Sequence, residues 1–235
     1  MSPNLDISTG IITYVVFVYS TVCHEAGHAW AAHRLGDDTA YSGGQVSLDP
    51  TPHIRREPIG MVVAPILSFL FSGGLIGWAS APYDPMWAER HPRRAAWMAL
   101  AGPAANLAFV LAAALLIRVG VEWQVFVAPD FADRTHVTEA VSGSGWEFAA
   151  LVLSIVYSLN LLLFVFNLIP LPPFDGSSVA MLLMNGRTAA KYQDFLAHGS
   201  FRFFGLFVAW QAIGNIFPPI FFSSLNLLYP GVYYG

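Results

Sequence analysis

The chain has 235 residues, of which 55% are hydrophobic and only 11% charged, and its formal net charge at pH 7 is −4. So few charged residues exclude an ordinary soluble domain and indicate an integral membrane protein, which we expect to form one membrane domain over residues 1–235. No basic tract is present, so nucleic acid is not an expected partner. The single cysteine, Cys23, excludes an intramolecular disulfide.

The first apolar run predicts a helix over residues 9–34, which at 1.5 Å per residue is about 39 Å long and can span a bilayer with tilt. A polar segment follows, in which Gly43–Leu48 is predicted to form a short strand after a glycine turn. A second apolar run covers residues 58–79 and is interrupted by Gly73 and Gly74.

The second half of the chain predicts further membrane spans over residues 95–117, 148–169 and 203–228. A polar loop over residues 120–146 separates the first two, and a polar link over residues 186–200 precedes the last. The chain is therefore predicted to be an all-α polytopic membrane protein, spanning the membrane several times.

The first predicted helix carries the pattern His-Glu-x-x-His at residues 24–28. Because residues four apart share one face of a helix, the imidazoles of His24 and His28 can bind one divalent ion. Glu25 adds a flanking carboxylate that can act on water at that ion. Two histidines do not complete a catalytic zinc site, which needs three protein ligands and an open position.

Asp175 is the best candidate for the third ligand. It follows Pro170, Pro172 and Pro173, which break the preceding helix. Ionisable residues at membrane depth usually mark function, and broken backbone there is tolerated only where protein or a watery cavity surrounds it. The alternative is that Asp175 caps a helix starting at Gly176 at the membrane surface. The paired histidines favour the metal site.

These motifs make the chain resemble the site-2 protease family of intramembrane zinc metalloproteases, and most of all its compact prokaryotic members without a PDZ domain. The resemblance rests on residues 24–28, on Gly102-Pro103-Ala104-Ala105-Asn106, and on the segment from Asn167 through Pro170 to Asp175 and Gly176. The chain departs from the family at Glu57, often an aspartate, and within residues 77–82, where relatives tend to have a lysine before the proline.

The resemblance implies a site-2 protease-like helical core, with short re-entrant or strand segments between the first helix and the helix that carries Asn106. It implies one zinc ion per chain, with the ligands His24, His28 and Asp175. Glu25 would be the general base and proton shuttle. Asn167 would position the substrate or stabilise the oxyanion, although a hydrogen bond at a helix end is the alternative. Asn106 is expected to serve packing and interhelical bonding.

The proposed ligands can meet only if the second apolar run does not cross the membrane. With a full crossing over residues 58–79, Asp175 would emerge on the side opposite His28. We therefore predict that residues 58–92 enter the membrane and return, with Gly73 and Gly74 at the turn. The eleven Lys and Arg then divide nine to two, the bias of a cytoplasmic face, instead of six to five. The site would open towards the cytoplasm, with the N-terminus outside.

The expected reaction is hydrolysis of a peptide bond in or near the transmembrane segment of a membrane-anchored protein, in a prokaryotic cell membrane. A helical substrate must unwind first, and Gly43–Leu48 or Trp78–Tyr83 could hold it by strand addition. The alternative is a metal-binding transporter or an inactive relative, but metal binding alone does not need Glu25. A histidine-rich oxidase is disfavoured because the remaining histidines are scattered, at His33, His53, His91, His136 and His198.

Overall fold

The computed structural model describes residues 6–196 and 200–235. Its long helices are α1 (Ile7–Leu35), α6 (Pro92–Glu122), α7 (Glu147–Asn167) and α10 (Ser200–Leu228). Its shorter helices are α2 (Thr39–Ser42), α3 (Pro50–Arg56), the π-helix η1 (Ile59–Val63), α4 (Ala64–Ser72), α5 (Pro85–Arg90), α8 (Asp175–Val179), the 3-10 helix η2 (Ala180–Leu183) and α9 (Gly186–Leu196). The strands β1 (Phe126–Val127) and β2 (Glu139–Ala140) form one antiparallel pair.

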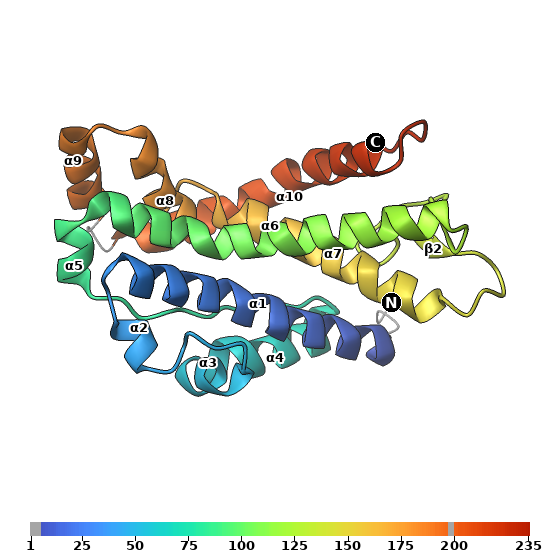
Figure 1. Cartoon of the computed structure of the whole chain (residues 1–235), viewed down its shortest axis with the longest axis horizontal. Coiled ribbons are helices and arrows are strands. Elements are labelled where there is room, and N and C mark those ends of the chain that lie inside the picture. Colours follow the sequence, from blue (N-terminus) through green and yellow to red (C-terminus); the bar gives the residue numbers. More distant parts are fainter. Residues whose placement is uncertain (1–5, 197–199) are drawn as a thin grey trace.

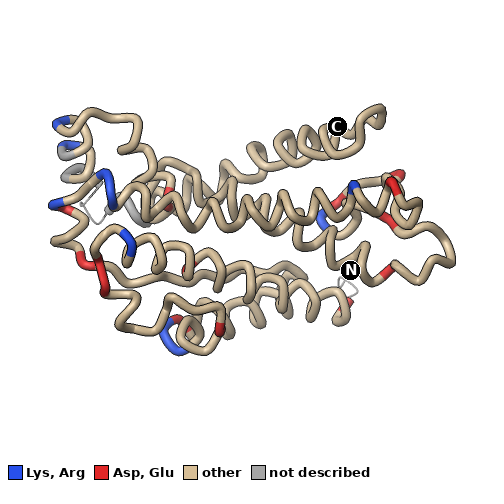
Figure 2. The backbone as a smooth tube through the Cα atoms, in the orientation of Figure 1, with Lys and Arg blue, Asp and Glu red and all other residues tan. Residues whose placement is uncertain are grey.

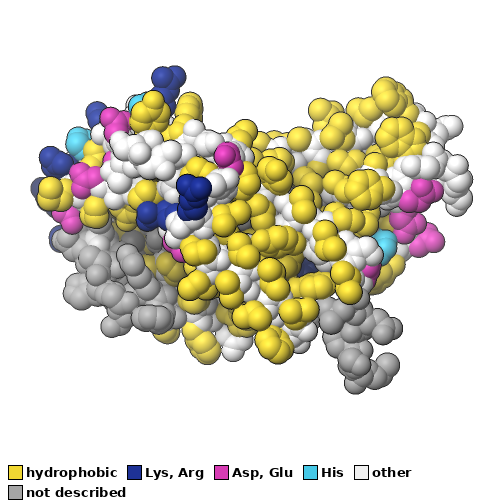
Figure 3. Space-filling view, turned by 90° about the horizontal axis from the view of Figure 1, so that it is seen from below, with side chains coloured by type: hydrophobic (Ala, Val, Ile, Leu, Met, Phe, Trp, Pro, Cys, Tyr) yellow, Lys and Arg dark blue, Asp and Glu magenta, His cyan; other side chains and the backbone are white. Residues whose placement is uncertain are grey.

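Within the described residues, four helices are long and apolar enough to cross a membrane: α1, α6, α7 and residues Phe204–Leu228 of α10. Hydrophobic side chains cover the middle of the molecule, and charged side chains gather towards its two ends (Figure 3). The chain is therefore an integral membrane protein of the all-α class, as its composition predicted.

Helix α1 has clear boundaries at both ends. Asp6 accepts hydrogen bonds from the backbone of Ser8 and Thr9, and the hydrogen bonds from Thr9 and Ser8 lower the pKa of Asp6 to about 2. At the other end Gly36, with φ of 102°, turns the chain out of the helix. Between these two caps α1 has 29 residues, and its bounds lie close to those of the predicted helix.

Helix α6 runs the length of the bundle and packs against both α1 and α7, with α7 crossing behind it in the view of Figure 1. The close approach of α1 and α6 requires a residue without a side chain, because a Cβ at Gly27 would lie 2.9 Å from the carbonyl oxygen of Ala101. Small residues at helix crossings are the usual means of packing in membranes. This contact brings the two helices together at the level of the histidine motif.

The second apolar run enters the bundle and turns back. The helical stretch Ile59–Ser72 is about 21 Å long, shorter than the roughly 30 Å hydrocarbon core. Gly73, with φ of 72°, ends α4, and residues 75–84 return in an extended conformation. The return ends beside α1, where the backbone N–H of Asp84 donates to Asp37 Oδ2 at 2.9 Å. The chain thus reverses at Gly73 and Gly74 and comes back towards the end of α1, the path that a re-entrant segment requires (Figure 1).

The ionised carboxylate of Asp37 holds this junction together. Burial raises the pKa of Asp37, but hydrogen bonds from the Thr39 hydroxyl and from the backbone of Asp84 and Thr39 outweigh it and lower the pKa below its usual value. Nearby, Arg94 Nη1 donates to the carbonyl oxygen of Leu35 at 3.2 Å. Lys and Arg side chains gather at this end of the bundle (Figure 2). The predicted basic face thus lies where α1 ends; the side chain of Arg202 lies outside the described residues.

Two local predictions are wrong. Residues Gly43–Leu48 form turns and bends, because Gly44 has φ of 73° and the carbonyl of Ser47 accepts from the His53 ring. The strand pair lies instead in the predicted polar loop, where Phe126 pairs with Ala140. The link over residues 186–200 contains α9, which packs Ala189 against Ala96 and Met181 and so buries an apolar face that the polar composition concealed.

Candidate metal centre

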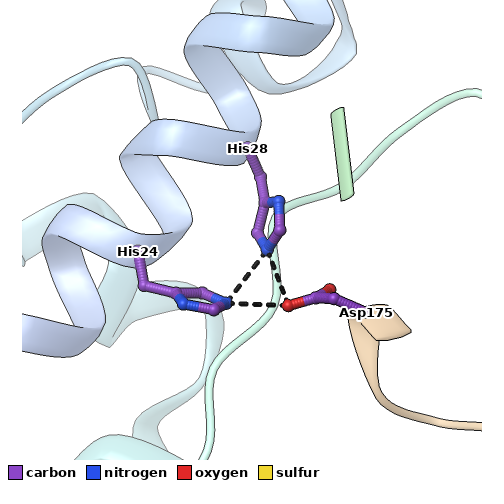
Figure 4. Close-up of side chains that lie close together, drawn as sticks. All are labelled: His24, His28 and Asp175. Atoms are coloured by element: carbon purple, nitrogen blue, oxygen red, sulfur yellow. Dashed lines mark hydrogen bonds and ion pairs between the residues drawn. The ribbon is translucent and has the colours of Figure 1, made fainter. Parts of the chain in front are cut away.

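Three side chains converge where α8 meets α1 and α6. His24 Nε2 and His28 Nε2 lie 3.0 Å apart, and Asp175 Oδ2 lies 3.1 Å from the first and 3.3 Å from the second (Figure 4). Two ligands bound to zinc at about 2.05 Å with tetrahedral angles are about 3.3 Å apart. The three separations therefore match a tetrahedral site that has one position left open.

The cluster lies inside the membrane-spanning part of the protein. His24 is about 26 Å along the axis from the start of α1, and His28 is about 10 Å from its end. Both histidines are buried, with 6% and 7% of the residue surface exposed. The site is thus nearer the basic end of the bundle than the middle.

Asp175 reaches the histidines because the chain breaks after α7. Residues 168–174 form turns, closed by backbone hydrogen bonds such as that from Phe174 to Leu171 at 3.0 Å. Gly176 packs against the Leu168 carbonyl, where a Cβ would clash. Asp175 is the first residue of α8, and Phe174 occupies the N-cap position without a side-chain hydrogen bond. The alternative that Asp175 is a helix cap is therefore wrong.

The hydrogen bonds of the two rings determine which nitrogens carry protons. His28 Nδ1 lies 2.8 Å from the carbonyl oxygen of Met98, which can only accept, so this Nδ1 is the donor. His24 Nδ1 lies 2.6 Å from Asn106 Oδ1, an acceptor as well. In the neutral rings both Nε2 atoms then have lone pairs directed at the Asp175 carboxylate.

This arrangement fits a metal ion. Asp175 Oδ2 is buried and has no hydrogen-bond donor among the described residues when both rings are neutral, because its neighbours are then two unprotonated nitrogens. Three converging lone pairs repel one another unless a metal ion or a proton lies between them. Two imidazoles and one carboxylate are also the donor set of catalytic zinc sites.

Helix α6 forms the wall of this site through Gly102. A Cβ at this position would meet the Nε2 atoms of both His28 and His24. Pro103 follows in the helix interior, where it removes a backbone donor. The absence of a side chain at Gly102 therefore allows the backbone of α6 to lie directly against the imidazoles.

The other predicted site residues lie near this centre in sequence but differ in their contacts. Glu25 is 5% exposed on α1, next to His24. Asn167 is the last residue of α7, and its Nδ2 donates to the carbonyl of Leu163 at 3.0 Å, the helix-end bond that the sequence left open. Among the described residues, neither is hydrogen-bonded to the cluster. Asn106 makes the expected interhelical hydrogen bonds.

One participant was not predicted from the sequence. Asn160 is fully buried on α7 and accepts a hydrogen bond from Asn106 Nδ2 at 2.9 Å. Its signal in the sequence was an amide in the middle of an apolar span, which is costly in a membrane unless it is paired. Extending the criterion used for Asp175 from ionisable side chains to polar ones would have selected Asn160.

The sequence also matches a known family over most of its length. The model of peptidase family M50 matches residues 12–208, which include the histidine motif, Asn106 and Asp175. The chain belongs to peptidase family M50. This is the site-2 protease family that the motifs indicated, so the resemblance is confirmed.

Similarity to individual proteins agrees with this assignment. The chain is 30% identical over 195 residues to "Putative zinc metalloprotease YwhC" of Bacillus subtilis, covering 83% of this chain and 78% of the relative. Two proteins described as "Putative zinc metalloprotease Rip2" match over 169 residues. The identity is 31% for the protein of Mycolicibacterium smegmatis and 30% for that of Mycobacterium tuberculosis. The chain covers only 54% and 56% of those two proteins. No solved structure matches.

Proposed function

We propose that this member of family M50 is an intramembrane zinc metalloprotease that cleaves membrane-anchored proteins in or near their transmembrane segments. The observation that carries the proposal is the convergence of His24, His28 and Asp175 at membrane depth, with Glu25 beside them. A site that only stored or transported metal would have no use for this additional buried carboxylate.

The residues then have distinct tasks. His24, His28 and Asp175 would hold zinc, which when bound supplies the Lewis acidity that activates water near neutral pH and polarises the scissile carbonyl. Glu25 accepts the proton of the attacking water and passes it to the leaving amine. Asn167 retains a second amide N–H beyond the one bonded to Leu163, and we assign it to the substrate carbonyl.

The extended segment 75–84 is the element best placed to hold an unwound substrate. A Cβ on Gly77 would run into Phe17, and the other end is bonded to Asp37, so the segment follows α1 past the histidines. Among the described residues, no backbone group of residues 79–83 pairs with another backbone. Such unpaired groups can accept an added strand. Residues 43–48 form turns and have no such edge.

The two departures from the family pattern meet on this segment. Ser80 Oγ donates to Glu57 Oε1 at 2.6 Å, and the Ser80 carbonyl accepts from Arg56 Nε at 3.0 Å. Glu57 and residues 77–82 are therefore coupled, and together they fasten the segment to the end of α3.

The proposal predicts metal-dependent cleavage of transmembrane peptides. Purified protein in detergent micelles should cleave members of a panel of such peptides, lose the activity on dialysis against a chelator, and regain it with one equivalent of zinc. Mass spectrometry of the products locates the cut. Cleavage that survives complete zinc removal, or that is confined to soluble peptides, would contradict the proposal.

The basic end of the bundle should face the cytoplasm, because most Lys and Arg lie there (Figure 2). A topology reporter fused after Pro85 is expected to give a cytoplasmic signal. The matched control is a fusion after Asp130, in the loop at the other end, which is expected to give an extracytoplasmic signal. The reverse pair of signals would contradict the proposal, through either an inverted orientation or a full crossing over residues 58–79, and equal signals would mean that α6 does not cross the membrane.

A further inference from the structure

A chain of hydrogen bonds runs away from the metal centre through the bundle. His24 Nδ1 is bonded to Asn106 Oδ1 at 2.6 Å, and Asn106 Nδ2 donates to Asn160 Oδ1 at 2.9 Å. Asn160 Nδ2 donates to Ser20 Oγ at 2.9 Å. The chain starts and ends on α1 and passes through α6 and α7. Ser20 is 2% exposed, and both amides are fully buried.

The direction of this chain is set at its far end by the backbone. Asn160 Nδ2 also donates to the carbonyl oxygen of Val156 at 2.8 Å, and a carbonyl cannot donate in return. The Oδ1 of Asn160 must therefore face Asn106 as an acceptor. It follows that Asn106 presents its Nδ2 to Asn160 and its Oδ1 to His24.

The two histidines reach the same protonation pattern by different means. For His28 the acceptor is the backbone carbonyl of Met98, which no substitution removes. For His24 the acceptor is a side chain, and its orientation depends on another side chain. If Asn106 rotated by half a turn about its amide, it would present Nδ2 to His24 and favour a proton on the Nε2 that faces the site.

We propose that Asn106 and Asn160 are positioning residues that hold His24 with its proton on Nδ1 and its Nε2 lone pair directed at the zinc ion. Ser20 closes the chain on α1. The inference rests on the proposed zinc site, but not on proteolysis. Amides suit this task at membrane depth because they fix a hydrogen-bond direction without adding a charge. Outer partners of metal-bound histidines typically change metal affinity 10- to 100-fold.

Zinc affinity tests the proposal without any substrate. The dissociation constant is measured in micelles by competition with a chromophoric chelator, for the parent and for Asn106→Leu, Asn106→Asp and Asn160→Leu. Asn106→Leu removes the acceptor and should weaken zinc binding about 10- to 100-fold. Asn106→Asp keeps an acceptor for His24 and should bind zinc nearly as the parent does, although its carboxylate faces Asn160 Oδ1 and should lower the unfolding temperature.

Asn160→Leu leaves both the ligand and its acceptor in place, and should weaken binding less than Asn106→Leu because the freed amide can rotate. The matched control is Ser154→Ala, which removes a fully buried hydroxyl on α7, the helix that carries Asn160. This hydroxyl is hydrogen-bonded to the backbone of Val137 and Thr138 and, among the described residues, to none of the site. It should lower stability without changing zinc affinity.

The outcomes separate the positioning role of Asn106 and Asn160 from the proposed metal site itself. If Asn106→Leu binds zinc as tightly as the parent, or if Asn106→Asp loses as much affinity as Asn106→Leu, the positioning role is wrong. If Asn106→Leu does not fold, Asn160→Leu decides the question. Parental zinc affinity in Asn160→Leu would contradict the positioning role of the two asparagines. A parent that binds no zinc would overturn the proposed metal site itself.

Discussion

Replacing Glu25 with glutamine is expected to reduce peptide cleavage by roughly 10²- to 10⁴-fold, the usual contribution of a general base. The amide has nearly the same shape as the carboxylate but cannot accept the proton of the attacking water. Because Glu25 is not one of the three converging ligands, Glu25→Gln should keep one zinc per chain. The measurement is the initial rate on the best transmembrane peptide, with zinc content determined on the same sample.

The matched control is Glu122→Gln, which makes the same exchange at the opposite end of the bundle. Glu122 lies at the end of α6, where its carboxylate is exposed and 3.4 Å from Arg118. Its substitution should leave both cleavage and zinc content unchanged. If Glu25→Gln cleaves as fast as the parent, Glu25 is not the base; if it loses zinc, the carboxylate belongs to the metal site.

The spans and the histidine pair could be predicted from sequence because their signals are local. A helical period places His24 and His28 on one face whatever surrounds them, and long apolar runs mark α1, α6 and α7. The return of residues 58–92 needed a longer argument, in which metal geometry and the distribution of Lys and Arg excluded a full crossing. Both arguments use constraints that any correct fold has to satisfy.

What sequence reasoning missed depends on tertiary contacts. Residues Gly43–Leu48 have strand composition, but the described part of the chain offers them no partner strand, and hydrogen bonds to Ser47 and Asp49 from nearby residues take precedence. The polar link contains α9 because Ala189 finds a pocket of apolar side chains on α6 and η2. The part played by Asn160 appears only once α7 is placed against α6.

The expected consequence of Gly102→Ala is loss of zinc. The added methyl group would occupy space taken by the Nε2 atoms of His28 and His24, so the imidazoles must turn away from Asp175. We expect zinc affinity to fall by more than about 100-fold, beyond the usual effect of losing an outer hydrogen-bond partner. The bundle should still fold, because alanine favours a helix over glycine by about 1 kcal/mol. Zinc per chain and the unfolding temperature of the zinc-free protein are measured together.

The decisive comparison is with a glycine that carries no such constraint. Gly214 lies in α10 with nothing within 4 Å of a Cβ, so Gly214→Ala gains the same helix propensity and should keep full zinc affinity. Asp175→Ala should lose zinc by a different route, since it removes a ligand and leaves the imidazoles in place. Equal zinc loss in Gly102→Ala and Asp175→Ala, with none in Gly214→Ala, would mean that the site needs the bare backbone of α6 as much as its third ligand. Parental zinc affinity in Gly102→Ala would show that the imidazoles can turn without leaving the ion, and that the close approach of α6 serves packing alone.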